Sequence, residues 1–206
     1  MSFYRNVTSK PWMHAGLRSD ALAKPAFDKP AQKVALNFFL AVASVVFSLL
    51  IVSSLMRMTM GADWVSVELP SLLWWNTGAL LLSSIAFQMA TTHARRGYVL
   101  SGLRWRFLLG GVLAIAFVAG QYVVWQQLEA AGSGLAVNPA SDFFYIFTGL
   151  HVAHLLGGLW VWTKTLLVLG RASDSRDVRL SIELCTTYWH FLLLVWLVLF
   201  YFLANN

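Results

Sequence analysis

Five long runs of apolar residues dominate the sequence and restrict the folds open to it. A helix crosses the hydrocarbon core of a bilayer in about 20 such residues, and a helix satisfies its own backbone hydrogen bonds there. The sequence therefore predicts an all-α integral membrane bundle of five transmembrane helices, with residues 34–206 as one domain. The predicted spans are about 34–55, 71–91, 107–128, 143–166 and 184–203.

The composition excludes several other classes of protein. Of the 206 residues, 58% are hydrophobic and 12% are charged, whereas a soluble domain has about 45–50% apolar and about 25% charged residues. An ordinary soluble enzyme, a disordered protein and a nucleic-acid-binding module are therefore excluded. The single cysteine excludes a disulfide framework and a multi-cysteine metal site.

The charged residues predict an orientation. Residues 1–33 are polar and carry six Lys or Arg; a signal peptide would place its apolar core nearer the N-terminus, so we expect a basic cytoplasmic arm. The connections after the second and fourth spans are also basic. The other two connections are acidic, with Arg57 at the edge of one of them. The positive-inside rule then places the N-terminus in the cytoplasm and the C-terminus on the periplasmic or outer side.

Ionisable residues inside the predicted spans are candidates for function. His151 and His154 are three residues apart, and Glu183 and His190 are seven apart. Each pair shares one face of its helix. Haem or metal ligation, a proton relay and a structural hydrogen-bond network all use such residues. We favour a structural polar network, because one acidic residue accompanies the histidines and polar groups join helices in lipid.

Other polar residues in the spans are expected to form hydrogen bonds between helices rather than a transport path. These are Asn76, Ser83, Ser84, Gln88 and Gln121.

The fourth and fifth spans carry motifs of a known family. Thr148-Gly149-Leu150-His151-Val152-Ala153-His154, followed by Gly157, resembles a signature of subunit III of the haem–copper terminal oxidases. The last span is similar to the last helix of that family in Glu183, Tyr188-Trp189-His190-Phe191 and Trp196. Glu68, Pro70 and Asn76 fit the start of the second span, and Gln121 fits the third.

The resemblance implies the five-helix form of cytochrome c oxidase subunit III, a multi-pass protein of the bacterial inner membrane in aerobic electron transport. It implies no catalytic residue, no metal ligand and no cofactor on this chain. Haem and copper belong to the partner subunits I and II of a proton-pumping complex. Subunit III is expected to brace subunit I and to hold phospholipid. Membership of a respiratory supercomplex and the electron donor stay open, and no nucleic acid is implied.

Two positions depart from the family pattern. Val124 and Leu193 stand where the family commonly has acidic residues, so a proton-related role of those acids is not carried over. Four alternatives remain: subunit III of a quinol oxidase, the subunit III-like protein of nitric oxide reductase, a small membrane transporter, and a membrane di-iron or haem enzyme.

Overall fold

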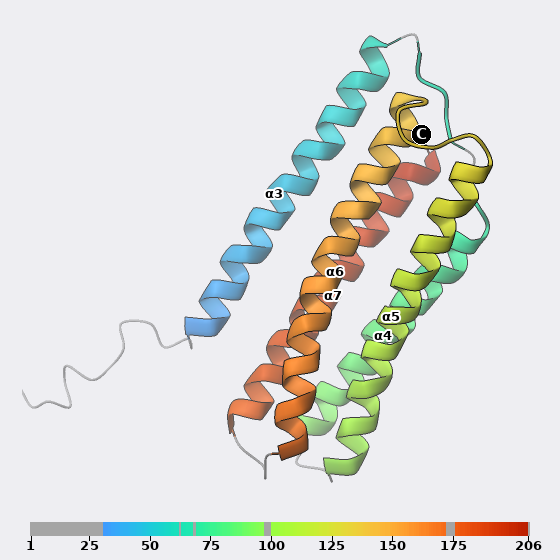
Figure 1. Ribbon diagram of the computed structural model, residues 1–206. Coiled ribbons are helices and arrows are strands. Elements are labelled where there is room, and N and C mark those ends of the chain that lie inside the picture. Colours follow the sequence, from blue (N-terminus) through green and yellow to red (C-terminus); the bar gives the residue numbers. More distant parts are fainter. Residues whose placement is uncertain (1–30, 62, 68, 97–99, 172–175, 206) are drawn as a thin grey trace, which may run out of the picture. The chain divides into compact units, whose positions relative to one another are not determined.

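The computed structural model describes residues 31–61, 63–67, 69–96, 100–171 and 176–205. Within these ranges the chain forms five α-helices and no β-strand. The expected all-α membrane bundle is confirmed, and the helices extend beyond most of the predicted apolar runs. They are α3 (Ala31–Met60), α4 (Leu72–Arg95), α5 (Leu100–Ala130), α6 (Pro139–Arg171) and α7 (Arg176–Asn205) (Figure 1).

The chain divides into two units, residues 1–37 and residues 38–206. Of the first unit the structure describes residues 31–37, which are the first turns of α3. The predicted cytoplasmic arm, residues 1–33, therefore lies almost wholly outside the described residues, and so does Glu68. The remaining description concerns the second unit.

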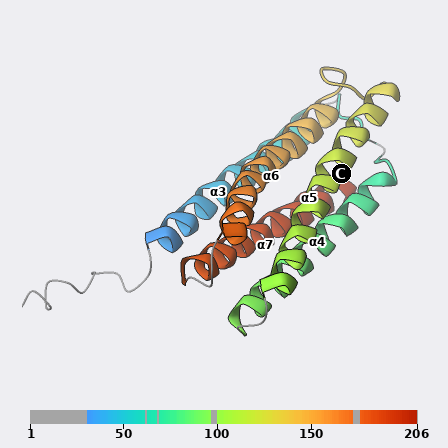
Figure 2. The same ribbon diagram turned by 60° about the horizontal axis from the view of Figure 1, so that its bottom comes forward.

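Helices α4 to α7 form a bundle in which each helix packs against two others. The neighbouring pairs are α4 with α5, α5 with α6, α6 with α7, and α7 with α4, and Figure 2 shows the four running side by side. Short connections make consecutive helices antiparallel. Large aromatic side chains fill the interior, including Phe87, Phe107, Phe117, Trp189 and Trp196, each at most 1% exposed.

Helix α3 packs against α6 and α7 through side chains. Phe47 is buried beside Phe147 on α6 and beside Val195 and Leu199 on α7. Three side chains of α3 are buried, namely Ala43, Phe47 and Ser54, and most of the others are exposed. The apolar outer face of α3 suits a helix in contact with lipid.

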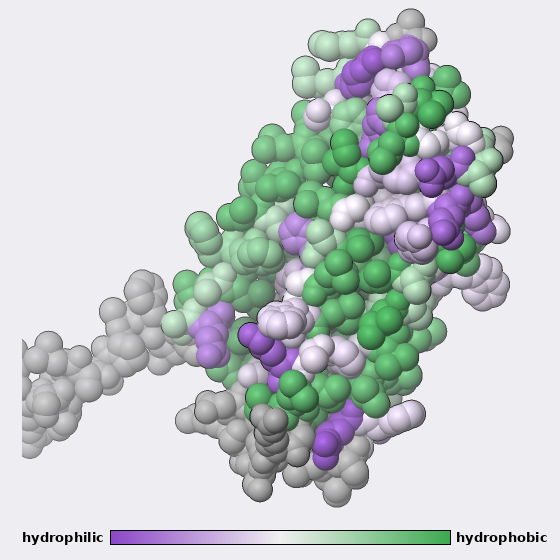
Figure 3. Space-filling model, viewed as in Figure 1, coloured by the Kyte–Doolittle hydropathy of each residue, from purple (hydrophilic) through white to green (hydrophobic). Residues whose placement is uncertain are grey.

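Four of the five described helices are long and apolar enough to cross a membrane. They are α3 and most of α5, α6 and α7. Helix α4 falls short because it carries many polar side chains, such as Asn76, Ser83, Ser84 and Gln88. It nevertheless lies between α5 and α7 in the bundle. Figure 3 shows large apolar areas over the visible face of the helices, as a protein in lipid requires.

The connections at one end of the bundle are tied down by polar side chains. The Asn138 side chain donates to the carbonyl of Val65 (2.6 Å) and accepts from the Ala140 N–H (2.9 Å), so it joins the loop after α3 to the start of α6. From the last turn of α3, the Arg57 guanidinium donates to the carboxylate of Asp63 in the same loop at 2.7 Å. This hydrogen bond lowers the pKa of Asp63 below its ordinary value of 3.8.

Candidate functional site

The two histidines of α6 lie on the side of that helix toward α3 and the bundle interior. His151 is fully buried, and its ring lies 5.1 Å from the Trp196 ring and 5.9 Å from the Phe117 ring. His154 is partly buried, and its Nδ1 donates to the Leu150 carbonyl of its own helix (2.8 Å). The Phe47 ring of α3 packs near both imidazoles, at 6.4 and 5.4 Å. These histidines therefore sit among aromatic rings from three other helices.

Glu183 and His190 of α7 face α4 instead. The His190 ring nitrogens are hydrogen bonded to the Ser84 hydroxyl (2.5 Å) and to Gln88 Oε1 (2.9 Å). Two turns away, Glu183 Oε1 accepts from Arg95 Nε at 3.0 Å. The two residues do share a face, as their spacing of seven predicts.

The expected network of His151, His154, Glu183 and His190 is thus divided between two places. The spacing gives the face on each helix correctly, but the polar face of α7 is turned toward α4 and not toward the histidines of α6. A different group joins α6 to α7, namely the Tyr188 hydroxyl, which donates to the His154 backbone carbonyl at 2.9 Å.

The family-motif side chains of Thr148, Trp189 and Trp196 contact neighbouring helices inside the bundle. Thr148 Oγ1 accepts from Trp125 Nε1 at 3.0 Å, which joins α6 to α5. Trp196 Nε1 donates to Thr77 Oγ1 at 3.0 Å, which joins α7 to α4. Trp189 stacks on Phe87 of α4, with ring centroids 5.1 Å apart.

The motif residues Asn76 of α4 and Gln121 of α5 lie close together where these two helices pack. Pro70 precedes α4, where proline suits a helix start. The Asn76 side chain packs directly on the backbone of α5 at Gly120. Gln121 follows Gly120 and is completely buried. By contrast, a side chain added at Gly149 or Gly157 would meet nothing within 4 Å.

Of the polar residues expected to join helices, Ser83, Ser84 and Gln88 of α4 form such hydrogen bonds, whereas Asn76 Nδ2 and both amide atoms of Gln121 have no partner among the described residues. Ser83 donates to the Gly110 carbonyl of α5 at 2.7 Å, and Ser84 and Gln88 bind His190. Sequence reasoning missed two further links, the hydroxyl pair of Thr91 and Thr186 (2.7 Å) and the ion pair of Arg95 with Glu183. The α4 partners lie in its last turns and the α7 partners in its first half. Spacing along the sequence does not say which helices are neighbours.

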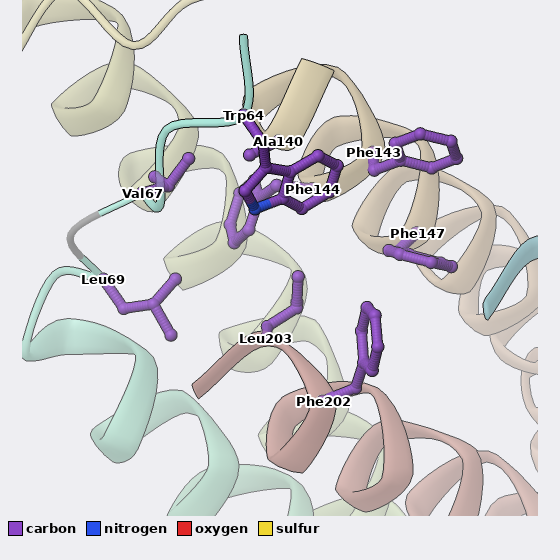
Figure 4. A pocket seen from close by; sticks show the side chains of 9 residues that line it. All are labelled: Trp64, Val67, Leu69, Ala140, Phe143, Phe144, Phe147, Phe202 and Leu203. Atoms are coloured by element: carbon purple, nitrogen blue, oxygen red, sulfur yellow. The ribbon is translucent and has the colours of Figure 1, made fainter. Parts of the chain in front are cut away.

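An apolar pocket lies beside the end of the bundle that carries the loop after α3. Trp64, Val67 and Leu69 come from that loop, and phenylalanines of α6 and the end of α7 complete the lining (Figure 4). Among the residues that the structure describes around the pocket, none of the lining side chains is ionisable. The chemistry of this lining suits an apolar group.

The ionisable residues that the structure describes do not gather into a metal-ligand set. Within the described ranges, no group of three or more His, Cys, Asp or Glu side chains is placed to hold a metal ion. The polar side chains instead join pairs of helices, which is the chemistry that this arrangement supplies.

Comparison with known proteins identifies the family. No protein-family model matches the chain. Cytochrome c oxidase subunit 3 of Synechocystis is 31% identical over 169 residues, covering 79% of this chain and 70% of that protein. The subunit 3 of Thermostichus vulcanus is 27% identical over 175 residues, covering 79% and 81%.

A probable cytochrome c oxidase subunit 3 of Mycobacterium tuberculosis is 29% identical over 124 residues. This match covers 60% of the chain and 61% of that relative, so the chain spans about three fifths of the mycobacterial protein. The expected resemblance to the oxidase subunit III family is confirmed by these relatives. The chain belongs to the cytochrome c oxidase subunit III family.

Proposed function

We propose that the chain is the non-catalytic subunit III of a bacterial proton-pumping cytochrome c oxidase in the inner membrane. The names of its relatives carry this proposal. Its task is structural: it braces subunit I and holds phospholipid, and it contacts subunit II within the same complex. Haem and copper belong to those partner subunits.

The use of the family-motif residues supports a structural task. The motif side chains Thr148, Tyr188 and Trp196 each hydrogen bond to a neighbouring helix. His190 and Glu183 do the same toward α4. Polar contacts of this kind hold membrane helices in register, so a rigid bundle is what these residues produce.

The distribution of charge along the helices supports the proposed orientation. Because consecutive helices are antiparallel, the end of α4, the start of α5, the end of α6 and the start of α7 share one end of the bundle. The basic side chains gather there, namely Arg95, Arg96, Arg104, Arg106, Lys164 and Arg179. Asp63, Glu129 and Asp142 lie at or beyond the opposite helix ends. The basic end then faces the cytoplasm.

Co-purification tests the proposal. A tag on the full chain should bring down, in mild detergent, a complex with an oxidase subunit I and a visible haem spectrum that consumes oxygen with reduced cytochrome c. Activity with a quinol alone would indicate the quinol type. A reductase partner with a haem and non-haem-iron centre would replace the proposal by the nitric oxide reductase reading. A chain that purifies alone and binds a solute would refute the oxidase role.

A variant separates bracing from catalysis. His190→Leu removes the two hydrogen bonds that the His190 ring makes to α4. The complex should then lose part of this subunit during detergent washing, while its haem content per subunit I stays unchanged. Thr187→Ala is the control, because the exposed Thr187 hydroxyl bonds to the Glu183 carbonyl of its own helix. Loss of haem in His190→Leu would contradict the structural role.

A further inference from the structure

The interior of the bundle contains polar atoms with no hydrogen-bond partner among the described residues. Both ring nitrogens of His151, both amide atoms of Gln121 and Nδ2 of Asn76 are in this state. The three side chains come from α6, α5 and α4, and they are at most 5% exposed. Native proteins leave very few buried polar groups unsatisfied, and an ordered water is a common partner.

The three side chains lie at one level of the bundle. Trp125 of α5 is bonded to Thr148 of α6. From that pair, Gln121 is four residues along α5, about 6 Å, and His151 is three residues along the antiparallel α6, about 4.5 Å. Gln121 and His151 therefore differ in height by about 1.5 Å.

Helices α4 and α7 meet the same level. Asn76 packs on Gly120, the neighbour of Gln121. Trp196 of α7 is in ring contact with His151 and donates its indole N–H to Thr77, the neighbour of Asn76. The Phe117 ring, one turn from Gln121, lies 4.8 Å from the Trp196 ring and 5.9 Å from the His151 ring. Side chains of all four helices of the bundle thus meet at the level of the unpartnered atoms.

The chemistry of these atoms suits water. A neutral imidazole offers one donor and one acceptor, Gln121 offers both kinds, and Asn76 Nδ2 offers donors. A buried water makes about three hydrogen bonds to such groups. The described carboxylates of these helices are far away: Glu129 is eight residues from Gln121, and Asp142 is nine from His151, about 12 Å or more along the helix. A site without a charged ligand favours water over a cation.

We propose that the bundle interior between Asn76, Gln121 and His151 is an internal hydration site that holds at least one ordered water. Gln121 is nine residues from the end of α5 at Ala130, so the site lies about 14 Å inside the helix end. The water links α4, α5 and α6 where no direct hydrogen bond between these three side chains does so.

Hydroxyl-radical footprinting of the purified complex, with radicals generated from water by X-rays, tests the proposal. Radicals formed at a bound internal water modify the side chains around it. Phe117 and Phe107 are a matched pair, since both lie on α5 and both are fully buried. Phe117 flanks the site. Phe107 lies ten residues before Phe117 on α5 and contacts Phe87 instead. We expect Phe117 and Trp196 to be modified faster than Phe107 and Phe87. Equal rates for Phe117 and Phe107 would overturn the proposal.

A double variant gives the second arm. Gln121→Leu with His151→Phe removes four of the five unpartnered polar atoms, leaves Asn76 Nδ2, and fills the space with apolar groups. The faster modification of Phe117 should then be lost, while Phe107 keeps its rate. A double variant in which Phe117 stays faster would show that the signal does not come from water at this site and would also overturn the proposal. The comparison within the unaltered complex holds even if the double variant fails to assemble.

Discussion

Replacing Gly111 by alanine should make the helix bundle open more often. A methyl group at this position of α5 would overlap the indole of Trp162 on α6. Trp162 is buried, and its Nε1 donates to the Phe107 carbonyl of α5 at 2.9 Å. The indole must therefore move away from α5, and this movement breaks the hydrogen bond.

The expected cost can be assembled from three contributions. Overpacking a core position costs about 1–3 kcal/mol, and losing the Trp162 hydrogen bond costs about 1 kcal/mol. Alanine stabilises the helix by about 1 kcal/mol relative to glycine because its helix propensity is higher. The net destabilisation is about 2 kcal/mol. This corresponds to a roughly 30-fold larger population of the open bundle, since each 1.4 kcal/mol is a factor of about ten.

Cys185 provides the assay. It is the one cysteine of the chain and is 2% exposed on α7, so a maleimide reaches it when the bundle opens. The labelling rate of the Cys185 peptide, followed by mass spectrometry in the purified complex, should rise about 30-fold in Gly111→Ala. Gly157→Ala is the matched control, because a methyl there meets no atom within 4 Å, and it should label no faster than the unaltered chain. Equal labelling of the two variants would refute the packing argument.

Two further predictions concern α3 and the loop after it. Phe47→Ala should lower the packing free energy that holds α3 by about 3–5 kcal/mol, and proteolysis in residues 61–67 should become faster. The control is the same change at Phe38, which is 73% exposed and should leave cleavage unchanged. Equal cleavage of the two variants would contradict the anchoring role of Phe47. The hydrogen bond from Arg57 holds the pKa of Asp63 below 3.8. This hydrogen bond therefore stabilises the fold above pH 3.8, and the stabilisation is lost as the pH falls through the lowered pKa of Asp63 in the folded protein. Infrared titration of the carboxylate, with Asp63→Asn as the blank, should place the midpoint below 3.8, and a midpoint at or above it would refute the pairing.

The sequence was sufficient to predict the helices but not the contacts between them. Runs of about 20 apolar residues have one stable form in lipid, and the five predicted segments are all helical. Spacing also placed His190 and Glu183 on one face of α7. It did not say which neighbour that face meets, because the rotation of a helix about its axis depends on the packing of the whole bundle. The orientation of the chain in the membrane stays a prediction from charge.

The contact between α3 and the histidines could not be predicted for a related reason. Phe47 is one of many apolar residues on α3, and its neighbours Val46 and Ser48 lie on the exposed part of the helix. Nothing in the local sequence marks Phe47 as the residue that reaches His151 and His154. The buried set on α3 is small, and a hydrophobic helix in lipid shows no contrast between a packed face and a lipid face.

Helix α4 shows how a helix that is marginal by composition belongs in this bundle. Its polar side chains point inward, where Ser83 bonds to α5 and Ser84 to α7. Its outward side chains include Trp75, Leu82 and Ile85, all exposed and apolar. The membrane therefore meets an apolar surface although the helix as a whole is not strongly apolar. Burying the Ser83 and Ser84 hydroxyl groups is favourable once α5 and α7 supply partners, so the polar residues that weaken α4 as an isolated span also fix its place among the other helices.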